Sequence, residues 1–349
     1  MLPQKRNRPG LTNGRILAIL SLVIVYLVSN QIRYSRAVEN GLKPSETKKQ
    51  IVVIQKGQTA KDVGKMLEEK DIIKNGNHLR KFLKKQDLSE KILAGRFELA
   101  PSMPIRQIAS IITDPSQAKN SITIPEGFSI RQIDERLAEL EIAKQGEFID
   151  AVKKFSNASR YPWLPKREIM ATPLPLEGFL FPDTYNIDPS HFSAKNLIAL
   201  MLENFKRHLP ENIETLLHEK NITLFELITV ASMLEKEVRH EDDLKIVSGI
   251  IWKRVRSGWF LNIDASVLYG LDKKTVTGDD LKRDTPYNTY TRKNLPLGPI
   301  GNPGQKTIEA ALSPQKSPYW FYLTNPKNGK AVYAVTNDGQ NRNRGIYLR

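Results

Sequence analysis

The chain contains no cysteine and only five histidines. Without cysteine there can be no disulfide, no thiolate nucleophile and no cysteine-ligated metal. The histidines lie at positions 78, 191, 208, 218 and 240, and none stands in an H-E-x-x-H pattern or another metal-ligand spacing. We therefore expect no metal and no other cofactor.

Long hydrophobic runs are also scarce. One run covers residues 16–28 and is extended by residues 29–32, which brings it near the lower limit of about 17 residues for a membrane helix. Residues 1–15 carry basic side chains and no acidic one. A cleaved signal peptide is the alternative, but no small-residue cleavage pattern follows the run. We expect a cytoplasmic tail over 1–15, a single-pass anchor over 16–32 and the rest of the chain outside the membrane.

Acidic residues are too few to balance the basic ones. The chain has 53 Lys and Arg against 38 Asp and Glu, a net charge of +15. A basic body of this kind suits nucleic acid, anionic lipid or an acidic wall polymer as a partner. The predicted position outside the membrane argues against nucleic acid and favours an extracytoplasmic polymer. The length of 349 residues suits a membrane segment followed by two modules.

A short motif occurs twice after the anchor. Residues 33–50 are polar, with Gly and Pro, and indicate a linker. A strand at 51–54 then leads through a turn into an amphipathic helix, and a second strand at 122–124 does the same. The two copies match at several positions: Gly57 with Gly127, Thr59 with Ser129, Val63 with Ile133 and Leu67 with Leu137.

The residues between the two copies indicate a small module. Residues 95–99 have the composition of a strand, and residues 103–112 that of a helix with proline in its first turn. Strands and helices in so small a unit, residues 51–119, resemble LysM, a module that binds the N-acetylglucosamine chains of cell walls. A plain stalk or docking module is the alternative.

One carboxyl follows a helix that is otherwise apolar. Residues 224–234 are apolar on nearly every face, which is typical of an interior helix, and Thr223 and Glu226 form a capping box at its start. Glu235 then stacks on apolar positions of the preceding turns. Burial disfavours the charged form of a carboxyl, so Glu235 is a candidate general acid. The alternative is a structural glutamate paired with a nearby Lys or Arg.

Three further segments join Glu235. They are residues 176–185 (LEGFLFPDTY), 285–290 (TPYNTY) and 295–304 (LPLGPIGNPG). In this order, after an anchor and a LysM-like unit, they resemble the endolytic murein transglycosylases, the MltG or YceG-like family, over roughly residues 50–349. Unrelated proteins seldom carry four such segments in one order.

The resemblance implies a fold and a setting. The fold would be α+β, with an N-terminal single-pass membrane helix, a small LysM-like α/β module over 51–119 and a larger mixed α+β catalytic domain over 120–349. The substrate would be the glycan strands of peptidoglycan, and the site would be the outer face of a bacterial plasma membrane. Peptidoglycan synthases at the same face would be neighbours.

The resemblance also implies that Glu235 is the catalytic acid/base. In lytic transglycosylases the C6 hydroxyl of the muramyl sugar attacks its own C1 and leaves a 1,6-anhydro end. Because this nucleophile is already tethered, one carboxyl can protonate the leaving oxygen and then accept the hydroxyl proton. Glu237 points about 200° away around the helix, so we expect it on the solvated face.

Other residues are candidates for substrate contact. Amide and ring groups suit N-acetyl sugars, although turn architecture accounts for an Asn equally well. A buried ion pair is an equal explanation for the candidate at 177, and a helix cap for the one at 264. The candidates are Glu177, Tyr185, Asp264, Tyr287, Asn288 and Tyr290.

The chain departs from the family pattern at two places. Asn262 stands where the family has Gln, and Ala265 and Ser266 stand where it has Pro-Thr. Near the C terminus, Ala331 and Gln340 replace histidines. Any role of those imidazoles is absent here or taken by other residues.

Three hypotheses follow from these observations. The first is a membrane-anchored lytic transglycosylase that cleaves the MurNAc-β-1,4-GlcNAc bond inside nascent strands and so limits their length. The second is a non-catalytic wall-binding scaffold, which the altered positions favour. The third is a hydrolase with two carboxylates, for which the sequence offers no convincing second acid.

Overall fold

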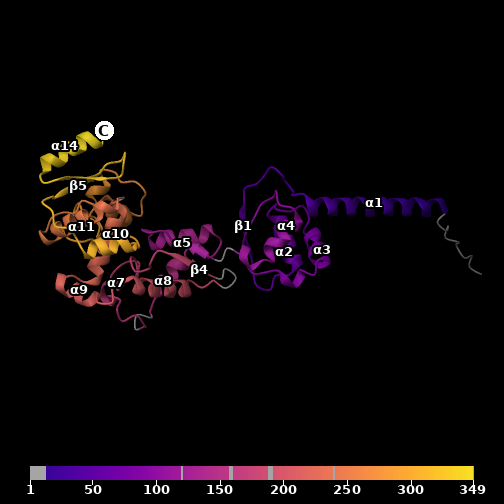
Figure 1. Cartoon of the computed structure of the whole chain (residues 1–349), viewed down its shortest axis with the longest axis horizontal. Helices are drawn as coiled ribbons and strands as arrows, with labels where there is room; N and C mark the ends of the chain where they lie inside the picture. Colours follow the sequence, from indigo (N-terminus) through magenta and orange to yellow (C-terminus); the bar gives the residue numbers. More distant parts are fainter. Residues whose placement is uncertain (1–12, 119–120, 157–159, 188–191, 239, 349) are drawn as a thin grey trace, which may run out of the picture. The chain divides into compact units, whose positions relative to one another are not determined.

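The computed structural model describes residues 13–118, 121–156, 160–187, 192–238 and 240–348, with side chains from residue 20 onward. The chain divides into two compact units (Figure 1). The first covers residues 1–120 with 188–191, and the second covers 121–187 and 192–349. The boundary that the sequence predicts between 119 and 120 lies outside the described residues.

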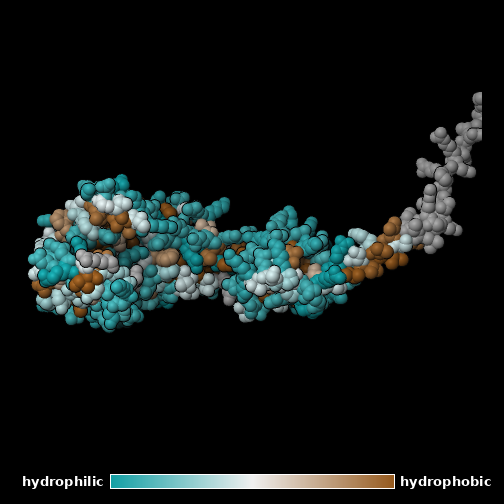
Figure 2. Space-filling model, turned by 90° about the horizontal axis from the view of Figure 1, so that it is seen from above, coloured by the Kyte–Doolittle hydropathy of each residue, from teal (hydrophilic) through white to brown (hydrophobic). Residues whose placement is uncertain are grey.

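The first unit begins with one long helix, α1 (Asn13–Glu39). It contains the anchor predicted over 16–32, whose apolar side chains are exposed from Leu20 through Val28 (Figure 2). No helix in the described part of the chain is both long enough and apolar enough to cross a membrane. The helix also continues over 33–39, where the sequence predicts a linker, because Tyr34 and Val38 are buried against the module that follows.

This module consists of a two-stranded sheet and three α-helices. Strand β1 (Gln50–Ile54) pairs antiparallel with β2 (Gly95–Leu99), so that Gln50 lies opposite Leu99 and Ile54 opposite Gly95. The helices are α2 (Ala60–Glu69), α3 (Gly76–Lys85) and α4 (Ile105–Ile112), with short 3₁₀ turns at Ser89–Lys91 and Pro115–Gln117. The predicted strand and helix segments are confirmed, and the likeness to LysM stays a prediction.

Helices α2 and α3 approach each other through glycine. A Cβ atom added to Gly64 would lie 2.6 Å from the carbonyl oxygen of Gly76, and one added to Gly76 would lie 2.4 Å from the carbonyl carbon of Gly64. Such contacts are closer than close packing permits, so only glycine fits at this crossing. The buried faces of α2, α3 and α4 close over the sheet with Val52, Ile54 and Phe97 as the centre of the core.

The second unit is a mixed α+β domain, as predicted. It contains two antiparallel strand pairs: β3 (Ser121–Thr123) with β4 (Thr184–Asn186), which are distant in sequence, and the hairpin of β5 (Phe321–Thr324) with β6 (Ala331–Ala334). Its helices are α5 (Ile130–Glu139), α6 (Glu147–Lys153), α7 (Lys166–Met170), α8 (Ala194–His208), α9 (Ile213–Lys220), α10 (Leu224–Glu237), α11 (Glu241–Arg256), α12 (Asp264–Leu271), α13 (Gln305–Leu312) and α14 (Asn337–Tyr347), with a 3₁₀ turn at Asp280–Lys282.

The duplicated motif forms the same local structure in both units. Gly57 and Gly127 each have a positive φ, of +87° and +76°, which L-residues with a Cβ rarely adopt. Thr59 begins α2 and Ser129 begins α5, and each forms a reciprocal capping box with the third helical residue. The repeat that the sequence predicts is therefore confirmed at the level of the strand, turn and helix.

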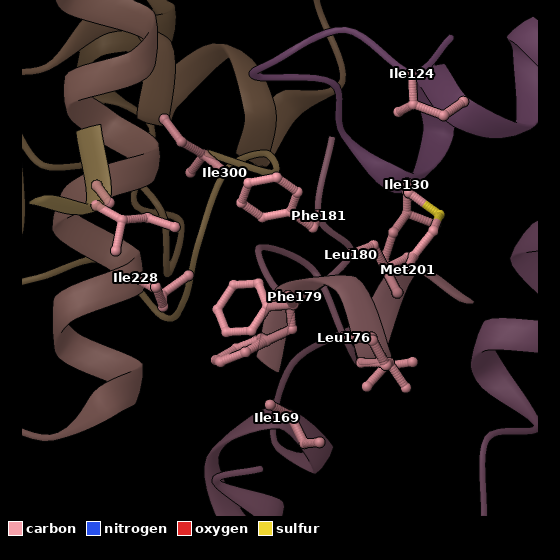
Figure 3. Packing of buried hydrophobic residues seen from close by; sticks show 14 of the residues in the cluster. Ile124, Ile130, Ile169, Leu176, Phe179, Leu180, Phe181, Met201, Ile228 and Ile300 are labelled. Atoms are coloured by element: carbon pink, nitrogen blue, oxygen red, sulfur yellow. The ribbon is translucent and has the colours of Figure 1, made fainter. Parts of the chain in front are cut away.

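Helix α10 runs through the core of the second unit. Its residues from Leu227 through Leu234 are all buried, and α13 and α11 pack against it. Phe179 and Phe181 lie between Ile228 and Ile300 on one side and the cluster around Met201 on the other (Figure 3). The apolar segment 224–234 is thus an interior helix, as predicted, and its last turn carries two glutamates.

Candidate functional site

Glu235 lies in the last turn of α10 and faces the start of α13. It is half-buried, and its Oε2 atom accepts hydrogen bonds from the Gly304 backbone N–H at 2.9 Å and from the Thr307 hydroxyl at 2.7 Å. Gly304 is the N-cap residue of α13, so the carboxylate meets the positive end of a helix dipole. The prediction that hydrocarbon surrounds Glu235 is therefore wrong for its carboxyl group, because two polar donors bind that group.

The 295–304 segment is tied to the turn after β3 by Asn302, which is fully buried. The backbone N–H of Gly127 donates to the Asn302 carbonyl at 2.7 Å, and the Asn302 N–H donates to the Phe128 carbonyl at 2.9 Å. Its side chain donates to the same Phe128 carbonyl at 2.8 Å and accepts from the Leu180 N–H at 2.9 Å. Sequence reasoning missed Asn302, although it stands inside a quoted motif between Gly and Pro.

Glu177 is a buried internal tie rather than an exposed contact. It is 2% exposed and accepts hydrogen bonds from the Ile130 N–H at 3.1 Å and the Tyr269 hydroxyl at 2.9 Å. Burial raises the pKa of this carboxyl to about 7. Because it joins the start of α5 to α12, its placement favours the structural alternative.

Tyr185 is likewise part of the core. Its hydroxyl donates to the Phe181 carbonyl and accepts from the Asn204 side chain at 3.1 Å. Burial raises the pKa of Tyr185 to about 12. Both hydrogen-bonding roles of the hydroxyl are used inside the protein, which leaves Tyr185 a structural role between β4 and α8.

Glu237, on the other side of α10, faces a different set of elements. It is half-buried, so the solvated face predicted for it is wrong. Burial raises its pKa to about 7, and the negative charge of Asp264 acts in the same direction. The Tyr322 hydroxyl of β5 lies 3.5 Å from Glu237 Oε2, and the Thr324 hydroxyl donates to the Glu237 carbonyl at 3.0 Å. The strands that cover this side are distant in sequence, which is why the helix alone did not reveal it.

Asp264 completes this cluster from α12. Its Oδ1 atom accepts a hydrogen bond of 2.6 Å from the Tyr290 hydroxyl, whose pKa is raised by burial and by this carboxylate. Ile263 occupies the N-cap position of α12 and no side chain caps the helix, so the cap predicted for Asp264 is wrong. The structure brings the candidates Asp264 and Tyr290 together, with Glu237 beside them.

The 285–290 segment positions Tyr290. Asn288 is 1% exposed; its amide donates to the Arg283 carbonyl at 2.7 Å and its oxygen accepts from the Tyr290 N–H at 2.8 Å. Tyr287 is buried edge-on against Tyr269, with ring centroids 4.8 Å apart. Asn288 and Tyr287 therefore shape the turn, as the alternative of turn architecture predicts for Asn288.

A buried arginine supports the strand beneath the cluster. Arg254 donates to the Trp320 carbonyl at 2.9 Å and to the Leu261 carbonyl at 2.6 Å, and its guanidinium lies 6.0 Å from the Tyr322 ring centroid. Burial lowers its pKa. Its place in the basic last turn of α11 is the one feature by which the sequence marks Arg254.

The two positions that lack the family histidines are occupied by structural contacts. The Ala331 N–H donates to Asp243 Oδ2 at 2.7 Å. Gln340 is 6% exposed and donates to the Tyr322 carbonyl at 2.9 Å. Gln340 thus helps to hold the strand whose Tyr322 side chain faces Glu237.

The Glu237 cluster has the chemistry of an acid paired with a carboxylate. One carboxyl is shifted toward its neutral form near pH 7 while a second lies beside it, which is the pattern by which acid and base roles are separated. Within the described ranges, no group of three or more His, Asp or Glu side chains is arranged to hold a metal ion. The raised pKa of Glu237 and the nearby Asp264 suit the cluster to proton transfer by side chains.

Comparison with known proteins agrees with the four quoted segments. The chain is 28% identical over 309 residues to the endolytic murein transglycosylase of Bacillus subtilis (strain 168), with 84% of each chain covered. It is 28% identical over 330 residues to the endolytic murein transglycosylase of Streptococcus pneumoniae serotype 2 (strain D39), covering 86% of this chain and 58% of that one.

A solved structure extends the agreement to the fold. The crystal structure of a yceG-like protein from Listeria monocytogenes matches with a TM-score of 0.62 and 29% identity, covering 84% of this chain and 98% of that chain. The model of the YceG-like family matches residues 52–345, which include both the duplicated motif and the glutamates of α10. The chain belongs to the YceG-like family.

Proposed function

We propose that this chain cleaves the glycan strands of peptidoglycan as an endolytic murein transglycosylase. Its curated relatives from Bacillus subtilis and Streptococcus pneumoniae carry that name. The observation that carries the proposal is the carboxyl pair of Glu237 and Asp264, with the Tyr290 hydroxyl bound to Asp264. Glycosidic cleavage uses a carboxyl that is protonated near neutral pH, and negative charge beside the sugar stabilises the oxocarbenium-like transition state.

We propose Glu237, two residues after the predicted Glu235, as the general acid. Glu237 has a pKa raised to about 7, so a large fraction carries a proton near neutral pH. The Oε2 atom of Glu235 is held by the Gly304 N–H and the Thr307 hydroxyl, which gives Glu235 the geometry of a helix-terminus contact. The assignment of Glu235 from sequence stays a prediction, and kinetics of the two Gln variants decides between the two glutamates.

The proposed reaction needs no water. Glu237 donates its proton to the glycosidic oxygen as the bond to C1 breaks, and the negative charge of Asp264 stabilises the positive charge that develops on the sugar. The C6 hydroxyl of the muramyl residue then forms a bond to C1 and gives its proton to the Glu237 carboxylate. The acid is restored, and the product carries a 1,6-anhydro end.

Asp264 also supports a second candidate function, hydrolysis. A second carboxylate beside the acid can activate a water molecule instead of waiting for the C6 hydroxyl. The sequence alone offers no convincing second catalytic acid. The charge of Asp264 nevertheless acts on Glu237. The two functions give different products and are separated by one measurement.

The test is mass spectrometry of purified glycan strands incubated with the full chain. Anhydromuramyl ends support the transglycosylase, ordinary reducing ends support the hydrolase, and intact strands support the non-catalytic scaffold. Internal cuts, rather than release of single disaccharides, are expected for an endolytic enzyme. The Glu237→Gln variant serves as the control for contaminating enzymes.

We also propose that α1 attaches the chain to the plasma membrane as a single-pass anchor with its N terminus in the cytoplasm. The support is the row of exposed apolar side chains from Leu20 to Ile32 and the basic residues before it. The enzyme would then meet nascent strands beside the wall synthases and limit their length, with residues 51–119 as a LysM-like wall-binding module. Retention of the full chain, but not of residues 40–349, in a carbonate-washed membrane fraction tests the attachment.

A further inference from the structure

The first unit contains a cavity of about 480 Å³ between α1 and the helices of the module. Its lining includes Arg33 and Arg36 from α1 and Lys74, Asn75 and His78 from the start of α3 and the turn before it. Among the described residues that line it there is no carboxylate. The described lining of the cavity therefore contains basic side chains and no acidic one.

Arg33, Arg36 and Lys74 at this cavity have no paired carboxylate within the described part of the unit. All three side chains are exposed. The acidic residue at the end of α1, Glu39, pairs with Arg106 instead. Unpaired basic side chains around a concave surface attract an anion.

His78 gives an independent sign of a missing partner. Its Nδ1 atom is buried and has no hydrogen-bond partner in the described part of the chain. Burial lowers the pKa of His78, and the charges of Lys81 and Arg33 act in the same direction. A buried ring nitrogen without a partner is an exception that a bound ligand would explain.

The position of the cavity along α1 identifies the source of the anion. The exposed apolar side chains of the helix run to Val28 and include Ile32 after three polar residues, and Arg33 follows directly, with Arg36 one turn later. If the apolar stretch lies in lipid, these arginines stand at the level of the headgroups, where basic side chains extend toward phosphate. A phosphate fits the fork of an arginine and the point charge of a lysine together.

We propose that this cavity binds the phosphate headgroup of an anionic phospholipid. The inference rests on the membrane attachment of α1 proposed above and is independent of the catalytic reaction. The headgroup would fix the module on the membrane surface through Arg36 and Lys74, while the lipid chains pack along the exposed face of α1.

The experiment uses the full chain in nanodiscs of phosphatidylcholine alone or of phosphatidylcholine with phosphatidylglycerol. Hydrogen–deuterium exchange is measured at the backbone amides around Lys74 and His78. We expect several-fold slower exchange with phosphatidylglycerol, and loss of most of that protection in Arg36→Gln and in Lys74→Gln. The matched control is Lys61→Gln, which removes the same charge from an exposed position of α2 and should keep the protection.

The remaining outcomes separate the possibilities. Equal exchange in the two lipids, or protection that survives both cavity variants, overturns the headgroup site while the attachment stands. Full protection by soluble glycerol phosphate in phosphatidylcholine nanodiscs overturns the lipid as the source and assigns the site to a free phosphate ester. Failure of the full chain to enter either nanodisc overturns the attachment and the headgroup site together.

Discussion

Glu235 and Glu237 stand two residues apart on α10 and meet opposite surroundings. Glu235 faces the start of α13, where a backbone N–H and a hydroxyl hold one of its oxygens. Glu237 faces α12 and β5, where burial and Asp264 raise its pKa to about 7. The pKa of a carboxyl in an apolar helix is therefore set by the residues of other elements that pack on its side of the helix. The sequence of the helix alone does not reveal those residues.

The largest effect should distinguish the two glutamates directly. Glu237→Gln should lower kcat by about 10³-fold, because a positioned general acid contributes about 10²–10⁴-fold. Glu235→Gln keeps an oxygen that can accept from Gly304 and Thr307, so it should cost less than about tenfold in kcat. Steady-state kinetics on purified glycan strands, with circular dichroism to check folding, gives both values. A larger loss in Glu235→Gln would return the acid role to Glu235.

The pH dependence of the reaction rate should show whether Asp264 acts on Glu237. The wild-type rate should fall above about pH 7, because Glu237, with its pKa of about 7, loses the proton that it must donate. Asp264→Asn removes a neighbouring negative charge, which lowers the pKa of Glu237 and moves the alkaline limb to lower pH. Tyr322 and Arg254, which also belong to the cluster, keep their side chains in this variant, and the pKa of Tyr290 falls because it loses the carboxylate beside it. An alkaline limb that stays in place would show that Asp264 does not act on Glu237.

Loss of the buried Asn302 side chain, near Glu235, should destabilise the protein. Asn302→Ala leaves the buried Leu180 N–H without its partner and removes a donor to the Phe128 carbonyl, which should lower the free energy of unfolding by about 3 kcal/mol. Urea unfolding of the full chain measures the change. The control Asn196→Ala, on the exposed face of α8, should leave stability nearly unchanged. A similar loss in both variants would contradict the role given to Asn302.

The smallest effect should come from the hydroxyl that holds Glu235. Thr307→Val keeps the shape and removes the hydrogen bond to Oε2, so it should cost about 1 kcal/mol of stability. Thr307→Ser keeps the hydroxyl and should retain most of this stability. Thermal unfolding measures the difference, and kcat should stay within about twofold of wild type. A large fall in kcat without loss of stability would place the reaction on this side of α10.

Much of the local structure could be predicted from the sequence. The capping box at Thr223 occurs where the spacing of polar residues predicts it, because it depends on contacts within one helical turn. Thr59 and Ser129 begin helices at the positions that the duplicated motif predicts. The interior character of α10 followed from its uniform hydrophobicity. The quoted segment at 295–304 meets the last turn of α10 through the Gly304 N–H, whereas the segment at 285–290 reaches Asp264 of α12 through the Tyr290 hydroxyl.

The surroundings of each side chain could not be predicted in the same way. Glu237 is covered by Tyr322 and Thr324, which are separated from it by more than 80 positions, and no periodicity reports such a contact. The family motif that contains Glu177 and Tyr185 predicts contact with substrate, whereas the hydrogen bonds of both side chains are internal. Helix geometry gave the direction of Glu237 correctly and left open what lies in that direction.

The continuity of α1 has a mechanical consequence for the first unit. The helix passes from its exposed apolar part to the buried Tyr34 and Val38 without a break, so the module cannot rotate independently of that apolar part. The orientation of the module about the helix axis is therefore set by the number of residues between the two. One residue inserted after Ile32 would turn the module by about 100° and shift it by about 1.5 Å along the axis, and would turn its basic cavity by the same angle relative to the exposed apolar side chains.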